Sequence, residues 1–335
     1  MRKIACFFAV ALCVACNYDV CDGSGEDLAG KSSGELSIKI EYETLTKSMT
    51  DYTEALEEEN VIEDITVLVF DKSTGKLNAS KEISRVDDRC VFSITTGEKV
   101  VYAVANAPDL STVLTLTQLK QVVDDMSQSD YFTDGFVMVG NEDCMVRVGE
   151  VSEPVIMLKR LVARVVLCQV KNSMASQYGP VSIDCVYLGN ANTVQTLGGS
   201  PSVTVNVNGY MDATKNRPIG KNNNQGACPE YMFRQVGVSV ANGSSNTDKY
   251  YMYSHPNGNG AKTCLYLLAT VGGDQYYYRV PLHNGLQANK TYSVDVEIVN
   301  LGAVEPPDGD FQKGEIKAFV NVSGWDAGDS YVVEF

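Results

Sequence analysis

The chain has 335 residues, of which 44% are hydrophobic and 21% are charged. This composition excludes a disordered or fibrous protein, and the length suggests roughly two domains, each with a core of its own. The formal net charge of −15 argues against a nucleic-acid partner, because affinity for a phosphate backbone comes largely from clustered lysine and arginine.

An export signal is predicted at the N-terminus. Arg2 and Lys3 precede an apolar stretch over residues 4–15, which is too short to cross a membrane as a helix. Ala15 is a small residue directly before Cys16, a pattern that resembles the lipobox of bacterial lipoproteins. We therefore expect residues 1–15 to be a lipoprotein signal peptide and Cys16 to carry the lipid, with plain secretion as the alternative. Multiple acyl chains would anchor the precursor stably to a membrane.

A flexible tether, a strand and a linker are predicted next. Residues 16–34 are rich in Gly, Ser and Asp without apolar periodicity, which is typical of a tether. Residues 35–42 alternate polar and apolar side chains, the period of a strand with one buried face. Residues 44–64 are acidic, hold few anchors for a core and include Lys47, which predicts a protease-accessible linker. The apolar positions of the first strand are Leu36, Ile38, Ile40 and Tyr42.

Further strands and one helix follow in the N-terminal half. The apolar run at residues 99–105 is typical of a strand that is covered on both faces. The helix is expected over residues 117–126, with Thr117 as its N-cap and apolar residues three and four apart. Its apolar residues are Leu119, Val122, Val123 and Met126. Other strands are predicted at residues 65–70, 90–94, 136–139 and 145–148, with a hairpin turn over residues 71–76.

A second all-β domain is expected after Pro154. Residues 155–170 form a long apolar run that Arg160 and Arg164 interrupt. Short strands separated by Asn-Gly and Gly-Gly turns continue to the end, a spacing typical of a β-sandwich. The sequence thus predicts an all-β fold with domains at residues 35–153 and 154–335 and one short helix in a connecting loop. The later strands are expected near residues 181–188, 203–207, 250–253, 263–271, 275–281, 291–299 and 318–322, with a surface loop over 213–226.

No catalytic chemistry is predicted. His255 and His283 lie beside turn residues, without metal-ligand spacing, and are expected on surface loops. The six cysteines of the body form no C-x-x-C pair, and most lie in apolar strand patterns, which favours buried thiols over disulfides or a metal site. We therefore expect neither a cofactor nor a metal, and no enzymatic activity. The six are Cys90, Cys144, Cys168, Cys185, Cys228 and Cys264.

The order of several segments resembles the fimbrillin family, the lipoprotein-derived subunits of type V pili. No single segment is as specific as a catalytic motif, and the resemblance depends on their order along the chain. The segments are residues 65–71 (ITVLVFD), 101–109 (VYAVANAPD), 155–166 (VIMLKRLVARVV), 186–191 (VYLGNA), 290–298 (KTYSVDVEI) and 320–325 (VNVSGW).

The resemblance implies two transthyretin-like β-sandwich domains and an outer-membrane lipoprotein precursor. It also implies that a trypsin-like protease removes the first strand, so that residues 35–47 would be lost on maturation. Lys47 is then the expected processing site, where the best-known members of the family carry arginine. Lys31 and Lys39 are the rivals, but one precedes the strand and the other lies inside it.

The resemblance further implies that a C-terminal donor strand enters the groove of a neighbouring subunit. Tyr331, Val333 and Phe335 would share its inward face, although this strand could instead close its own domain. The expected function is a structural subunit of a cell-surface fimbria, joined to copies of itself or related pilins and supporting adhesion or biofilm formation. The alternative is a non-polymerising surface lipoprotein, such as a pilus anchor, a tip adhesin or a module that binds glycan or protein.

Overall fold

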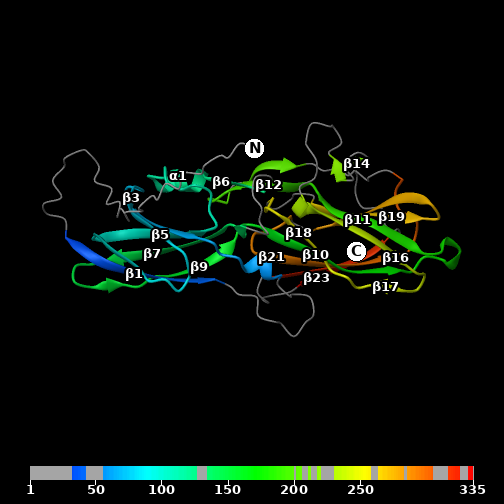
Figure 1. Ribbon diagram of the computed structural model, residues 1–335, viewed down its shortest axis with the longest axis horizontal. Coiled ribbons are helices and arrows are strands. Elements are labelled where there is room, and N and C mark those ends of the chain that lie inside the picture. The colour runs from blue at the N-terminus through cyan, green and yellow to red at the C-terminus, as the bar shows by residue number, and fades with distance from the viewer. Residues whose placement is uncertain are drawn as a thin grey trace, which may run out of the picture.

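A computed structural model describes residues 32–42, 56–126, 134–199, 201–205, 210–212, 217–219, 230–257, 263–282, 285–304, 316–324 and 331–334. Strands dominate this part of the chain, so the predicted all-β class is confirmed. The molecule is elongated, with the strands of residues 33–160 gathered mainly at one end and the later strands at the other (Figure 1).

The N-terminal strands form an eight-stranded sheet in the order β3-β2-β5-β7-β9-β1-β4, and β8 pairs with β1. Side chains of β1 and β4 and of β2 and β5 meet in one apolar core. The bounds are β1 (Ser33–Tyr42), β2 (Ile65–Asp71), β3 (Leu77–Ile83), β4 (Cys90–Thr95), β5 (Gly97–Ala105), β7 (Met138–Val146), β8 (Val151–Ser152) and β9 (Val155–Arg160).

Strand β5 is covered on both faces, as its continuous apolar run predicts. Val101 and Ala103 point into the N-terminal core. Val100 and Tyr102 point to the other face, where they join a larger apolar cluster that extends into the C-terminal half. The two halves of the molecule therefore share one continuous apolar cluster.

The C-terminal half contains two principal sheets. One has the order β17-β10-β21-β22-β23 with β18 paired to β10, and the other has the order β16-β11-β19-β20. Apolar side chains of both sheets pack in the larger cluster. The bounds are β10 (Ala163–Asn172), β11 (Val181–Gly189), β16 (Phe233–Val240), β17 (Ser245–Asn246), β18 (Tyr250–Ser254), β19 (Cys264–Val271), β20 (Asp274–Pro281), β21 (Lys290–Ile298), β22 (Ile316–Gly324) and β23 (Tyr331–Glu334).

Two small ladders complete the fold. Strand β12 (Ala191–Thr196) pairs with β13 (Pro201–Val205) and with β6 (Val123–Asp125). Strands β14 (Tyr210–Asp212) and β15 (Arg217–Ile219) form a two-stranded ladder, so the predicted surface loop over residues 213–226 contains one short strand. The 3-10 turns are η1 (Glu57–Asn60), η2 (Ser176–Tyr178) and η3 (Glu230–Met232).

The predicted helix over residues 117–126 is wrong at both ends. Helix α1 spans Leu116–Gln121, and its N-cap is Thr115 rather than Thr117, with the Thr115 hydroxyl accepting from the Gln118 backbone N–H. The chain then turns extended, because β6 forms a ladder with β12. Apolar residues three and four apart had suggested one continuous buried face of a helix, yet the side chain of Val123 is 45% exposed.

The apolar run over residues 155–170 consists of two strands rather than one. Strand β9 pairs with β1 and β7 of the N-terminal sheet, whereas β10 pairs with β18 and β21. The boundary near Pro154 stays a prediction. Since hydrogen-bonding partners change after β9, we propose that the division falls at residues 161–162.

Candidate functional site: the first strand and its groove

Strand β1 lies inside the N-terminal sheet and pairs with β4, β8 and β9. Its first part pairs antiparallel with β4, from Ser33 opposite Thr95 to Ile38 opposite Cys90. Its last part pairs parallel with β9, from Lys39 opposite Val155 to Tyr42 opposite Leu158. A short parallel ladder also joins Glu35 and Leu36 to Val151 and Ser152 on β8. Removing β1 would therefore leave unpaired backbone groups on three strands.

The inward side chains of β1 fill the middle of the N-terminal core. Leu36, Ile38 and Ile40 are 0%, 5% and 4% exposed, while Glu35 and Lys39 face solvent. This alternation agrees with the pattern predicted from the sequence, although Tyr42 is only partly buried. Burying three such side chains contributes on the order of 5 to 9 kcal/mol.

The walls of the β1 groove are apolar. Phe92 and Cys90 on β4 lie directly opposite Leu36 and Ile38, and both are buried. On the other side, Ile156 on β9 lies opposite Ile40 and has no exposed surface. A strand that replaced β1 would thus need apolar side chains at these three positions.

One end of the groove is closed by backbone. A Cβ atom at Gly34 would overlap the carbonyl oxygen of Arg147 and would lie 2.7 Å from Val146 Cγ1. A glycine within a strand commonly marks a point where another backbone approaches closely. The position of Gly34 therefore accepts no side chain without movement of β7 or of the turn after it.

The chain just after the predicted linker is held by buried polar contacts. Glu59 in η1 has no exposed surface. Its Oε2 lies 2.6 Å from Arg164 Nη1, and its Oε1 accepts a hydrogen bond of 2.6 Å from the Tyr253 hydroxyl. Arg160 donates from Nε and Nη2 to the Glu59 carbonyl oxygen at 3.1 and 3.0 Å. We call these four residues the Glu59 clamp.

The Glu59 clamp shows that the end of the predicted linker is anchored. Residues 44–64 were predicted to be a linker with few anchors, but Glu59 is buried and fixed within that range. Burial and the adjacent Glu59 carboxylate raise the pKa of Tyr253 well above its usual value, so this hydroxyl remains a donor. Arg160 and Arg164 were the available signal, because a buried cation within an apolar run requires a carboxylate or carbonyl partner.

The C-terminal strand β23 lies at an edge. It pairs antiparallel with β22, with Val333 opposite Val320 and Tyr331 opposite Val322. Within the described part of the chain this is its only ladder, and it ends the sheet order. Releasing β23 would break one ladder, whereas releasing β1 would break three, with β4, β8 and β9.

Several predicted positions lie outside the described residues: Cys16, Lys47, Cys228, His283 and Phe335. Among the described residues, Cys90 and Cys168 are buried free thiols, as expected, and burial raises the pKa of each to about 11. No helix in these ranges is long and apolar enough to cross a membrane.

The expected surface position of His255 is wrong. Its side chain has no exposed surface, and its Nε2 lies 3.3 Å from Asp124 Oδ2 on β6. Its backbone N–H donates to the Asn192 carbonyl oxygen at 3.0 Å. Burial lowers the pKa of His255 to about 4, so the imidazole is neutral at pH 7 and helps to pack β6 against the C-terminal half.

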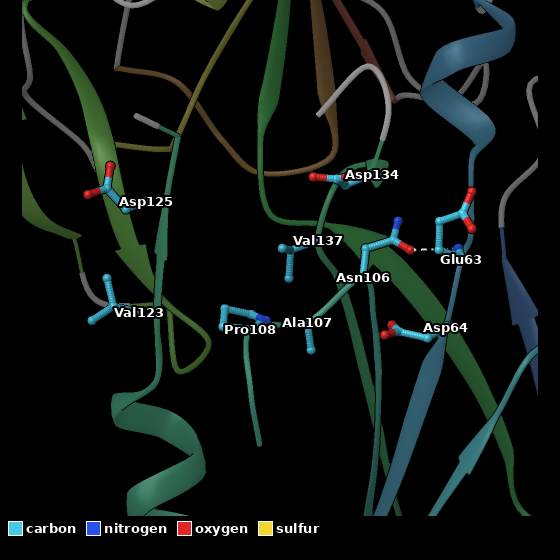
Figure 2. Close-up of a pocket in the computed structure, with 9 residues that line it drawn as sticks. All are labelled: Glu63, Asp64, Asn106, Ala107, Pro108, Val123, Asp125, Asp134 and Val137. Atoms are coloured by element: carbon cyan, nitrogen blue, oxygen red, sulfur yellow. Dashed lines mark hydrogen bonds between the residues drawn. The ribbon is translucent and has the colours of Figure 1, made fainter. Parts of the chain in front are cut away.

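A cavity of about 420 Å³ lies between β6 and the segment before β2 (Figure 2). The Asn106 amide fixes one wall, donating to the carbonyl oxygens of Val61 and Phe136 and accepting from the Glu63 backbone N–H. Within the described ranges, no group of three His, Cys, Asp or Glu residues is arranged to hold a metal. The cavity is lined by Glu63, Asp64, Asn106, Ala107, Pro108, Val123, Asp125, Asp134 and Val137.

Comparison with solved structures places the fold among fimbrial and cell-adhesion proteins. A protein assigned to cell adhesion from Parabacteroides distasonis ATCC 8503 matches with a TM-score of 0.62 and 17% identity, over 89% of this chain and 99% of that one. A fimbrilin (FimA) from Porphyromonas gingivalis W83 matches with a TM-score of 0.60 and 15% identity, over 89% and 99%. The tip fimbrial protein Mfa3 from Porphyromonas gingivalis gives a TM-score of 0.51 and 16% identity, over 88% and 100%.

The sequence comparison identifies the family signature. Residues 34–151, about a third of the chain, match the family model described as major fimbrial subunit protein (FimA). Comparison with curated proteins finds no match. The expected resemblance to the fimbrillin family is thus confirmed, with the signature in the N-terminal segment and the fold of a solved fimbrilin over most of the chain.

Proposed function

We propose that this protein is a structural subunit of a cell-surface fimbria and polymerises by exchange of strands between subunits. The observation that carries the proposal is β1. It fills a three-site apolar groove between β4 and β9 and is followed by a segment predicted to be cleavable. Its loss would expose unpaired backbone and apolar surface, which a strand from another subunit can cover.

Processing is proposed at Lys47 by a trypsin-like protease. Lys39 is a poor substrate in the intact fold, because its backbone N–H donates to the Pro154 carbonyl oxygen and its neighbours on β1 are buried. The Glu59 clamp supports a cut upstream of residue 56, because it would hold the new N-terminal segment on the body after cleavage.

The precursor is proposed to reach the outer membrane as a lipoprotein acylated at Cys16, with a tether ahead of β1. Because β1 begins at Ser33, the tether predicted over residues 16–34 ends earlier than the sequence pattern suggested. Cutting at Lys47 would separate the folded body from this anchor. One cleavage would then both release the subunit and open its groove.

The donor is proposed to be the C-terminal segment that contains Tyr331, Val333 and Phe335. Its support is the edge position of β23, which is held by β22 through one ladder. The period of two places these three side chains on one face. The filled groove would join one copy to the next, and the partners would be further copies or related pilins.

The test is mass spectrometry and N-terminal sequencing of the mature surface protein, together with trypsin treatment of purified precursor. A mature N-terminus at Ser48 and ladders of SDS-resistant oligomers are expected. A surface form that keeps acylated Cys16 joined to intact β1, and stays monomeric after the same treatment, would contradict polymerisation. It would support the non-polymerising alternative, an anchor, a tip adhesin or a binding lipoprotein.

A further inference from the structure

We propose that the β1 groove fixes the register of the incoming strand, so that Val333 of a second copy takes the place of Ile38, directly opposite Cys90. This inference rests on the proposed function and adds to it the placement of the partner strand. Two features of the groove carry it, its closed end and its three buried sites, and the residue opposite the middle site allows it to be tested.

The closed end sets a limit. At Gly34 a Cβ atom would overlap the Arg147 carbonyl oxygen. No inward residue of the segment 331–335 is a glycine. Any register that places Tyr331, Val333 or Phe335 at the Gly34 position therefore requires the wall of the groove to move.

The three buried sites set a second limit. Leu36, Ile38 and Ile40 are each at most 5% exposed, so every vacated site must be filled by apolar atoms. A site left empty in a packed core typically costs about 2 to 5 kcal/mol. Three inward apolar residues, Tyr331, Val333 and Phe335, match three sites at the same spacing.

Both limits are met only when Val333 lies at the Ile38 site, the middle one of the three. A shift of two residues toward Gly34 puts an aromatic residue on the closed end, and a shift of two residues away leaves the Leu36 site without any of the three. A slip of one residue turns Glu334 into the core. In a strand that runs with β1, Asp329 would fall at the Gly34 position and meet the same wall. The closed end therefore favours a strand that runs against β1, with Phe335 at the Leu36 site, Val333 at the Ile38 site and Tyr331 at the Ile40 site.

The residue opposite the middle site is Cys90, which allows a direct test. Neighbouring strands in a sheet lie about 4.7 to 4.9 Å apart, so the Cα atoms of two directly paired residues are within the range that a disulfide can join. A cysteine at position 333 of one copy should therefore cross-link to Cys90 of the next, whereas a cysteine at position 332 should point away from it.

The experiment compares Val333→Cys with the matched control Val332→Cys, both in a Cys144→Ser background that removes the partly exposed thiol on β7. Full-length precursors are cut with trypsin, allowed to assemble, oxidised, boiled in SDS and run without reductant. Val333→Cys is expected to give covalent ladders that disappear with reductant and with Cys90→Ser, and Val332→Cys is expected to give none.

The outcomes separate the register from the function. If Val333→Cys assembles without a cross-link, or if Tyr331→Cys or Phe335→Cys links to Cys90 instead, the register is overturned and strand exchange still holds. If the unsubstituted, trypsin-cut protein forms no oligomers, the proposed function fails and the register falls with it.

Discussion

Glu59 is a carboxylate with no exposed surface, held by Arg164, Tyr253 and the chain around it. Removing two charges from water costs nearly as much as their attraction returns, so an intact buried pair adds little net stability. Removing one partner is different, because the other charge stays buried without compensation. The Glu59 clamp therefore matters most when it is broken.

We expect Glu59→Gln to lower the free energy of unfolding by about 3 to 5 kcal/mol, because the Arg164 guanidinium loses its carboxylate in a buried site. Urea unfolding at pH 7 measures the change. The matched control is Glu63→Gln, an exposed carboxylate four residues later, which should change the free energy by less than about 0.5 kcal/mol. Equal effects from the two substitutions would show that the clamp has no special role.

His255 gives a pH prediction. Its folded-state pKa of about 4 lies below the ordinary value of 6.5, because burial outweighs the backbone hydrogen bonds with Leu161 and Asp124 and the charge of Asp125. Between these two values the unfolded chain binds the proton and the folded chain does not. The contribution of His255 to the free energy of unfolding is therefore fully present above pH 6.5. It falls by on the order of 3 kcal/mol as the pH drops to 4.

Unfolding free energies measured from pH 7 to pH 4 for the native protein and for His255→Gln check this. Other groups titrate in both proteins, so the informative quantity is the difference between the two curves. That difference should shrink as the pH falls. Parallel curves would mean that His255 keeps an ordinary pKa in the fold.

At the scale of elements, β1 is constrained by the close approach of the chain at Gly34. We expect Gly34→Ala to destabilise the intact chain by about 1 to 3 kcal/mol, because the added methyl group meets the backbone of Arg147. Thermal unfolding of the uncut protein measures it, with Ser33→Ala, exposed and one residue earlier, as the control. A Gly34→Ala protein as stable as the control would show that this end of the groove can open.

Strands with one clear period were predictable from sequence. β1, β2 and β5 lie close to their expected ranges, because alternation and apolar runs report burial directly. The end of the helix was not predictable, because apolar residues three and four apart fit both one long helix and the short helix followed by a strand that α1 and β6 form. Only the distant partner strand β12 decides between them.

The buried polar residues were the harder part of the site. Arg160 and Arg164 looked like interruptions of a strand, and Glu59 looked like part of a solvated acidic run. Their partners lie about a hundred residues away in sequence, so no local pattern connects them. His255 was misplaced for the same reason, because its contact with β6 crosses between the two halves of the chain.

At the scale of the whole molecule, the larger apolar cluster and the Glu59 clamp join the two halves, while β1 belongs to the smaller N-terminal core alone. We expect cleavage after Lys47 and loss of β1 to speed hydrogen exchange in β4 and β9, because their ladders with β1 are gone. Exchange in β11 and β19 should be unchanged. Hydrogen-exchange mass spectrometry of dilute cut protein measures both, and equal acceleration throughout would contradict a local effect.

The Glu59 clamp also has a consequence for the order of events during biosynthesis. Its ligands come from residues 160, 164 and 253, and Arg164 Nε donates in turn to the Thr291 hydroxyl. Contacts between such distant residues close large loops and form late. On the export route proposed above, a chain that emerges N-terminus first cannot complete the Glu59 clamp until the start of its last quarter, which contains Tyr253, has emerged. The Glu59 clamp therefore forms only late in synthesis. This delay would keep partly exported chains from reaching the folded state that can assemble.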